Sequence, residues 1–149
     1  PFVCGHFEKR NRYILPENIE WVYSLFKGHT YYIQRTFNEA FADTAEGDEC
    51  TMEIIKSAID NMVASNDTIF REILSNIPEK QKALLYAIAK DGEAKSITST
   101  EFIKRHSLPS ASSVQSSARI LLEKDYITCI NKVYTLTDKL FAMWINRLF

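Results

Sequence analysis

Residues 110–138 read SASSVQSSARILLEKD followed by YITCINKVYTLTD, and this stretch decides the fold. Ser110 stands where a helix would begin. Val114, Ala118, Leu121 and Leu122 then share one helical face and are expected to pack inward. The second part alternates apolar and polar residues on either side of Asn131-Lys132, which is typical of two strands joined by a tight turn. The stretch therefore predicts a capped, polar helix followed by a small β-hairpin.

The residues around this stretch complete a known order of elements. Pro78 favours the start of a helix over 79–90, which Asp91-Gly92 ends. Ser96-Ile97 is expected to form a minimal strand, and a short helix is expected over 100–106. A last helix is expected over 138–149. Helix, short strand, two helices, hairpin and helix is the order of a winged helix-turn-helix.

The first half of the chain is expected to be helical as well. Apolar residues at helical spacing predict helices over 16–27, 29–43 and 51–77, the last with a break at Asn66-Asp67. The acidic residues 43–49 are expected to form a solvated loop. Since the residue before a proline is biased away from helix, Pro78 is the expected domain boundary. The predicted fold class is mainly α: a helical-bundle domain over 1–77, then a winged-helix domain with a β-hairpin wing over 78–149.

Composition limits the classes of function. The chain has 149 residues and a formal charge of −1, with 46% hydrophobic and 25% charged residues, which is ordinary for a globular protein. Residues 1–77 carry seven Lys and Arg against twelve Asp and Glu, or −5, and residues 78–149 carry eleven against seven, or +4. Two modules with different surfaces are therefore expected, but +4 is a weak signal for nucleic-acid binding.

The sequence offers no motif for catalysis. It contains neither a G-x-x-x-x-G-K-[ST] phosphate loop nor a G-x-S-x-G or H-E-x-x-H motif, so this chain alone is expected not to be an enzyme. Cys4, Cys50 and Cys129 lack zinc-site spacing; free thiols in the cytoplasm are expected, and no bound metal. No membrane association is expected. Because the chain begins with Pro1, we expect a fragment or a processed form.

The predicted helix over 110–125 has a polar outer face that suits nucleic-acid contact. Hydroxyl and amide side chains bond phosphates or base edges, and basic side chains bond phosphates. The candidate nucleic-acid-binding residues on this face, at the wing tip and nearby are Ser112, Ser113, Gln115, Ser116, Arg119, Lys132, Lys104 and Arg105. With one arginine on the face, the residues slightly favour protein contacts or domain positioning over sequence-specific DNA binding.

A second candidate site lies where two predicted helices meet, at Gly28-His29-Thr30. Glycine closes the first helix, and the next helix begins with backbone N–H groups that lack helical partners. Such a helix end carries partial positive charge and is able to face a phosphate. From spacing alone, however, an ordinary helix corner is the favoured interpretation.

Taken in order, several motifs resemble the C-terminal half of the archaeal-type ATPases, AAA+-like P-loop proteins of archaea and many bacteria. These motifs are GHTYYIQ over 28–34, the approach to the boundary over 74–81, SSVQ over 112–115 with LLEKD over 121–125, and YTLTDKLFAMW over 134–144. In that family the winged helix ends in a pattern that Tyr134, Leu136, Asp138, Phe141 and Trp144 match. The family usually has Gly-His-Pro where this chain has Thr30 as the third residue.

This resemblance implies a function for the chain as part of a larger protein. It implies a nucleotide-responsive helical lid followed by a winged-helix module that contacts DNA or protein. ATP and Mg would bind the parent ATPase through Walker motifs in an upstream nucleotide-binding domain, with Gly28, His29 and Thr30 sensing the nucleotide. Two alternatives stay open: a stand-alone winged-helix transcriptional regulator with an N-terminal helical ligand or dimerisation domain, and a module whose apolar last helix docks on another chain.

Overall fold

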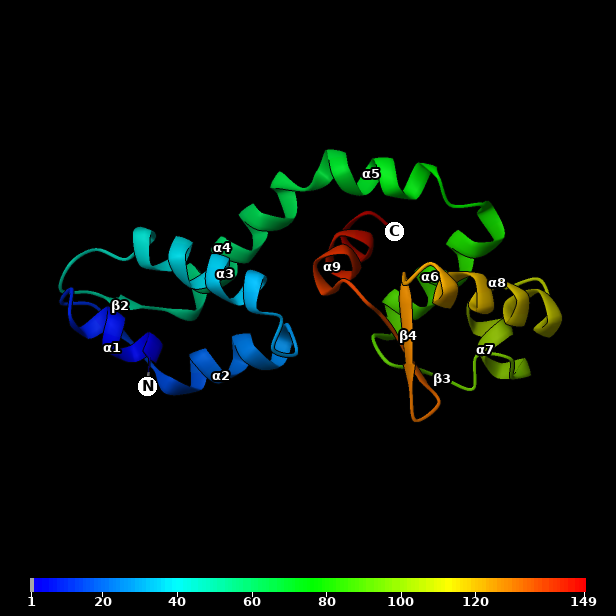
Figure 1. Cartoon of the computed structure of the whole chain (residues 1–149), viewed down its shortest axis with the longest axis horizontal. Helices are drawn as coiled ribbons and strands as arrows, with labels where there is room; N and C mark the ends of the chain where they lie inside the picture. Colours follow the sequence, from blue (N-terminus) through cyan, green and yellow to red (C-terminus); the bar gives the residue numbers. More distant parts are fainter. Residues whose placement is uncertain (1) are drawn as a thin grey trace. The chain divides into compact units, whose positions relative to one another are not determined.

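Apolar side chains at helical spacing gather into two separate cores along the chain. In the computed structural model, which describes residues 2–149, the chain is mainly helical and divides into one unit that ends at Ser65 and another that begins at Asn66 (Figure 1). The predicted fold class, a helical bundle followed by a winged helix with a hairpin wing, is confirmed. Among the described residues, every helix is too short or too polar to cross a lipid bilayer.

The first unit is a helical bundle with one two-residue sheet. Its elements are α1 (Phe2–Glu8), β1 (Tyr13–Ile14), α2 (Pro16–Leu25), α3 (Thr30–Asp43), β2 (Glu49–Cys50) and α4 (Met52–Ser65). Pro16 begins α2, where its missing N–H costs nothing. The parallel pairing of Ile14 with Cys50 joins the start of the unit to the end of the acidic loop. Neither α1 nor this sheet was expected, because both are too short to show a period in the sequence.

The second unit contains the winged helix. Its elements are α5 (Asp67–Ser75), α6 (Glu79–Asp91), β3 (Ala94–Lys95), α7 (Thr100–Arg105), α8 (Ala111–Glu123), β4 (Ile127–Ile130), β5 (Val133–Leu136) and α9 (Lys139–Leu148). The three strands are antiparallel in the order β3-β5-β4. The β4–β5 hairpin projects from the helices as the wing (Figure 1). It turns at Asn131 and Lys132, whose φ angles of 51° and 63° suit a tight two-residue turn.

The minimal strand lies two residues before its expected place. Ala94 and Lys95 pair with Tyr134 and Val133, whereas Ser96 has a φ of 50° and ends the strand. Ile97 is buried, but it lies in the turn that leads to α7. The apolar signal of Ile97 was therefore correct for burial and wrong for strand pairing.

The division between the units lies upstream of the predicted boundary at Pro78. Helix α5 belongs to the second unit because the Phe70 ring packs on Phe141 and Trp144, with centroids 5.0 and 5.7 Å away. The indole Nε1 of Trp144 also donates a hydrogen bond of 2.8 Å to Asp67. Pro78 caps the start of α6 inside this unit. A proline thus marks a break between two helices that share one core.

Asp67 at the start of α5 links folding to pH. The hydrogen bond from Arg71 and then that from Trp144 lower the pKa of this carboxyl group. A lowered folded pKa adds stability above the unfolded pKa, near 3.9, and that stability is lost as pH falls through the folded value. We expect Asp67→Asn to flatten the fall of the melting temperature with pH below about 4. Thermal unfolding monitored by circular dichroism between about pH 2 and 5 tests this, with Asp125→Asn as the exposed control. Equal acid slopes in both variants would contradict it.

The last helix turns most of its large apolar side chains inward. Phe141 and Trp144 are each 3% exposed in the core with α5, whereas Leu148 and Phe149 at the end are 44% and 67% exposed. The alternative in which Phe141 and Trp144 dock on another chain is therefore not available without unfolding this core. Leu148 and Phe149 are the large apolar side chains of this segment that remain exposed.

Candidate nucleic-acid interface

Helix α8 begins as the sequence predicts, with Ser110 as its N-cap. The Ser110 Oγ accepts a hydrogen bond of 3.2 Å from the backbone N–H of Ser113, and this satisfies one of the free donors in the first turn. The second hydroxyl near the cap belongs to Ser112, whose Oγ lies 3.2 Å from that of Ser110. Ser113 takes part in this cap through its backbone N–H.

The buried face of α8 differs from the expected one at Ser117 and Leu122. Val114, Ala118 and Leu121 are buried as expected, together with Ser117. Leu122, which was expected to pack inward, is 37% exposed. It follows Leu121 by one residue, and each residue of an α-helix turns the side chain by about 100°. When Leu121 points to the core, Leu122 lies at the edge of the outer face.

The outer face of α8 forms one wall of a groove. The turn after β3 and the tip of the wing form the rest, and we call this space the recognition groove. Its open volume is about 1160 Å³. The groove is lined by Lys95, Ser96, Ile97, Thr98, Ser112, Gln115, Ser116, Ala118, Arg119, Leu122, Glu123, Asn131, Lys132, Val133 and Tyr134.

The structure gathers some of the predicted site residues in this groove and leaves others outside. Ser112, Gln115, Ser116, Arg119 and Lys132 line it together. The three predicted residues outside are Ser113, Lys104 and Arg105. The Arg105 guanidinium pairs instead with Asp91 at 2.6 Å and with Glu101 at 3.8 Å, so its charge is largely compensated.

Sequence reasoning missed two important members of the groove. Lys95 was missed because the strand was expected at 96–97, and only its pairing with Val133 brings it beside the wing. Tyr134 could have been predicted as a groove residue, because the alternation of side chains along the predicted hairpin already fixes the face of the sheet on which it lies. Burial raises the pKa of Tyr134, and the hydrogen bond with Cys129 across the ladder raises it further. Tyr134 therefore presents a neutral hydroxyl to the groove near neutral pH.

The recognition groove is moderately basic. Lys95, Arg119 and Lys132 contribute positive charge, and among residues 2–149 none of them forms an ion pair. Glu123 is the one carboxylate in the lining. Hydroxyl, amide and cationic groups in this arrangement suit hydrogen bonds to phosphate oxygens and base edges.

The predicted nucleotide-sensing corner lies between α2 and α3. Lys27 and Gly28 have φ angles of 48° and 78°, and the Gly28 N–H donates to the Tyr23 carbonyl at 3.1 Å, which ends α2. His29 is the N-cap of α3 without a side-chain hydrogen bond, and its ring stacks on Tyr32 at 4.6 Å. The first turn of α3 is therefore not capped by a side chain.

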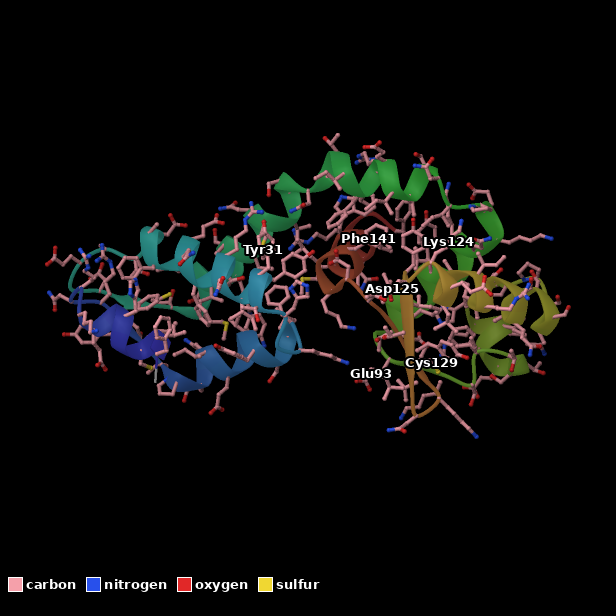
Figure 2. The ribbon with its side chains drawn as sticks, viewed as in Figure 1. Tyr31, Glu93, Lys124, Asp125, Cys129 and Phe141 are labelled. Carbon is pink, nitrogen blue, oxygen red and sulfur yellow. The ribbon has the colours of Figure 1, made fainter. Side chains whose placement is uncertain are left out.

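A small cavity opens beside this corner. It measures about 160 Å³, and Gly28 and Thr30 line it with several aromatic side chains, including Phe7, Tyr23 and Phe37. His29 is not part of its wall. Gly28 and Thr30 therefore line the cavity, whereas the His29 ring packs on Tyr32. Tyr31, which follows on α3, is 58% exposed and is labelled in Figure 2.

The three cysteines lie in different surroundings. Cys4 is half-buried, Cys50 is buried and Cys129 is exposed on the wing (Figure 2). Burial raises the pKa of the Cys50 thiol, which keeps it protonated. Within the described part of the chain, no group of three or more His, Cys, Asp or Glu residues is placed to hold a metal ion.

The elements of the second unit define a winged helix, and comparison with known families agrees. Residues 68–147 match the family described as "Probable winged helix domain", so the chain belongs to this family. The match begins within α5, which agrees with the place of that helix in the second unit. No curated protein matches the chain by sequence.

A solved structure extends the similarity to both units. The Walker-type ATPase of Pyrococcus abyssi has a TM-score of 0.65 and 18% sequence identity to this chain. The similarity covers 97% of this chain and 40% of the ATPase chain, so this chain spans less than half the length of that protein. At this identity the likeness concerns the fold.

Proposed function

We propose that this chain is the C-terminal part of a P-loop ATPase, made of a helical lid and a winged-helix effector module. The observation that carries the proposal is the similarity of fold to a Walker-type ATPase over 97% of this chain, which includes both units and not the winged helix alone. The sequence has no Walker A motif. ATP and Mg would therefore be held by an upstream domain of the same protein.

In this proposal the α2–α3 corner faces the bound nucleotide. The first turn of α3 has no side-chain cap, so its backbone N–H groups are compatible with an anionic group. His29 beside them supplies a ring nitrogen for a hydrogen bond. The chemistry that ATP supplies is phosphoryl transfer to water, and the residues of this chain would sense the nucleotide and not cleave it.

The lid assignment predicts a local response to nucleotide in the protein with its upstream domain. Addition of ATP and Mg should slow amide exchange of residues 28–32 by roughly tenfold, because bound phosphate restrains the start of α3. His29→Ala should remove most of this protection. Hydrogen exchange followed by mass spectrometry measures it, with the loop over 43–49 as internal control. Unchanged exchange at 28–32 under saturating ATP would contradict the lid function.

The winged helix in this proposal contacts duplex DNA through the recognition groove. Three cations and a set of hydroxyl and amide side chains line the groove, and a single carboxylate opposes them. Cationic side chains bond the phosphates of a duplex, and amide and guanidinium groups such as those of Gln115 and Arg119 bond base edges. Because only three cations take part, binding is expected to be modest in affinity.

DNA binding by the groove has a defined salt dependence. Neutralisation of three phosphates gives a slope of roughly −3 for log K against log salt. Arg119→Glu and Lys132→Glu should each weaken binding roughly tenfold at low salt and make the slope shallower. Fluorescence anisotropy with a labelled mixed-sequence duplex at low and moderate salt measures this. Lys90→Glu, which reverses a charge outside the groove, is the matched control. If no salt-sensitive binding occurs even at low salt, the groove serves protein contacts instead.

A further inference from the structure

A second groove in the winged-helix unit shares no residue with the recognition groove. It lies among α6, the end of α7 and the last turn of α9, and its open volume is about 630 Å³. We call it the α6–α9 groove. None of its lining residues belongs to the proposed nucleotide-sensing corner or to the recognition groove, so this groove is available for a different ligand.

One end of the α6–α9 groove is aromatic and apolar. The rings of Tyr86 and Phe149 stack with centroids 4.6 Å apart and an angle of 18°. Phe149 remains 67% exposed, because only one face of its ring is covered by Tyr86. Ala83 and Ala87 lie along α6 beside this pair, and their small side chains leave room for another chain to approach.

The other end of the groove carries one cation, Lys90, that no carboxylate compensates among residues 2–149. Lys90 and Arg105 line it together with His106, and no Asp or Glu side chain lines the groove. Asp91, which holds Arg105 at 2.6 Å and His106 at 2.9 Å, lines a different hollow with Glu101. Lys90 has no ion-pair partner among residues 2–149. The charge of Lys90 therefore remains available to a ligand.

We propose that the α6–α9 groove binds an acidic peptide segment of a partner protein, with an apolar side chain next to its carboxylates. The apolar side chain would pack on Tyr86 and Phe149, and a carboxylate beside it would pair with Lys90, since Arg105 is already paired with Asp91. An acidic peptide with an apolar residue matches the charge at one end of the groove and the apolar surface at the other. A nucleic acid would leave Ala83 and Ala87 without an apolar contact. This would give the winged helix a protein contact independent of its contact with DNA.

The test is selection of peptides from a random display library on the complete chain. Selected peptides should combine Asp or Glu with a neighbouring Leu, Ile or Phe. Lys90→Glu should weaken their binding roughly tenfold by charge reversal, and Phe149→Ala by a similar factor through loss of the aromatic contact. Both positions are exposed, so these variants are expected to fold; circular dichroism checks this. Lys132→Glu in the recognition groove is the matched control and should leave peptide binding unchanged.

The outcomes separate this proposal from the DNA function. Loss of peptide binding in Lys90→Glu with retained binding in Lys132→Glu supports it, whatever the duplex-binding assay gives. Selected peptides without acidic residues, or equal affinities for Lys90→Glu and the unchanged chain, would overturn it. A second outcome would also overturn the proposal. If no acidic peptide is selected, and a labelled oligothymidylate binds the unchanged chain but not Lys90→Glu, the groove binds single-stranded nucleic acid instead.

Discussion

A fragment that begins at Pro78 is expected to be largely unfolded, whereas a fragment that begins at Asn66 is expected to fold. The shorter fragment lacks α5 and with it Phe70, Leu74 and Ile77, which are buried in the complete chain. Each buried side chain of this size contributes about 1.5–3 kcal/mol, so the loss is roughly 4–9 kcal/mol. Because a domain is typically stable by only about 5–15 kcal/mol, most of the shorter fragment should lose its fold.

Urea unfolding of the two fragments, followed by tryptophan fluorescence, measures this difference directly. Trp144 is a suitable reporter because its ring lies against Phe70 and is 3% exposed. In the fragment from Asn66 it should give a cooperative transition, and in the fragment from Pro78 a red-shifted emission without urea. Equal midpoints would mean that α5 is not part of the winged-helix core, and the boundary at Pro78 would then be correct.

Leu121→Ala is expected to destabilise the second unit by about 2–5 kcal/mol, whereas Leu122→Ala should cost less than about 1 kcal/mol. Leu121 is 0% exposed, so its loss leaves a cavity beneath α8. Leu122 is 37% exposed in the recognition groove, where water replaces the lost side chain. The two variants remove the same atoms from adjacent residues of one helix and differ in burial.

Chemical unfolding measured by far-UV circular dichroism gives both free energies of unfolding. Duplex binding provides a second measurement, because Leu122 lines the groove and Leu121 does not. Leu122→Ala should keep the fold, so any change in its duplex affinity reports on the groove surface. Leu121→Ala should lower both the stability and the duplex affinity. A cost for Leu122→Ala as large as that for Leu121→Ala would show that α8 buries both residues, as the sequence first indicated.

The fold of the second unit was largely predictable, because its signals are local. Ser110 caps α8, and Asn131-Lys132 turns the wing. Asp138 caps α9 by accepting hydrogen bonds from Leu140 and Phe141. Elements too short to give a clear pattern, such as the seven-residue α1 and the two-residue strands β1 and β2, were missed, since they depend on contacts distant in sequence.

The candidate site was predictable only in part. Helical spacing placed Ser112, Gln115, Ser116 and Arg119 on one face, and the turn placed Lys132 at the wing tip. It did not reveal that Arg105 is neutralised by Asp91, 14 residues before it, or that Lys95 joins the groove through its pairing with β5. A basic residue in the sequence indicates charge, and only its neighbours in space decide whether that charge is free.

By itself the sequence determined the type and order of the main helices, the hairpin and the winged-helix class, because caps, turns and periodicity act over a few residues. Tertiary structure alone decided that α5 joins the winged helix, which of Leu121 and Leu122 is buried, and which cations remain unpaired around the recognition groove. These features depend on contacts between elements far apart in the chain, such as Asp67 with Trp144. Local patterns carry no information about such partners, and so the stretch over 110–138 determined the fold but not its binding surface.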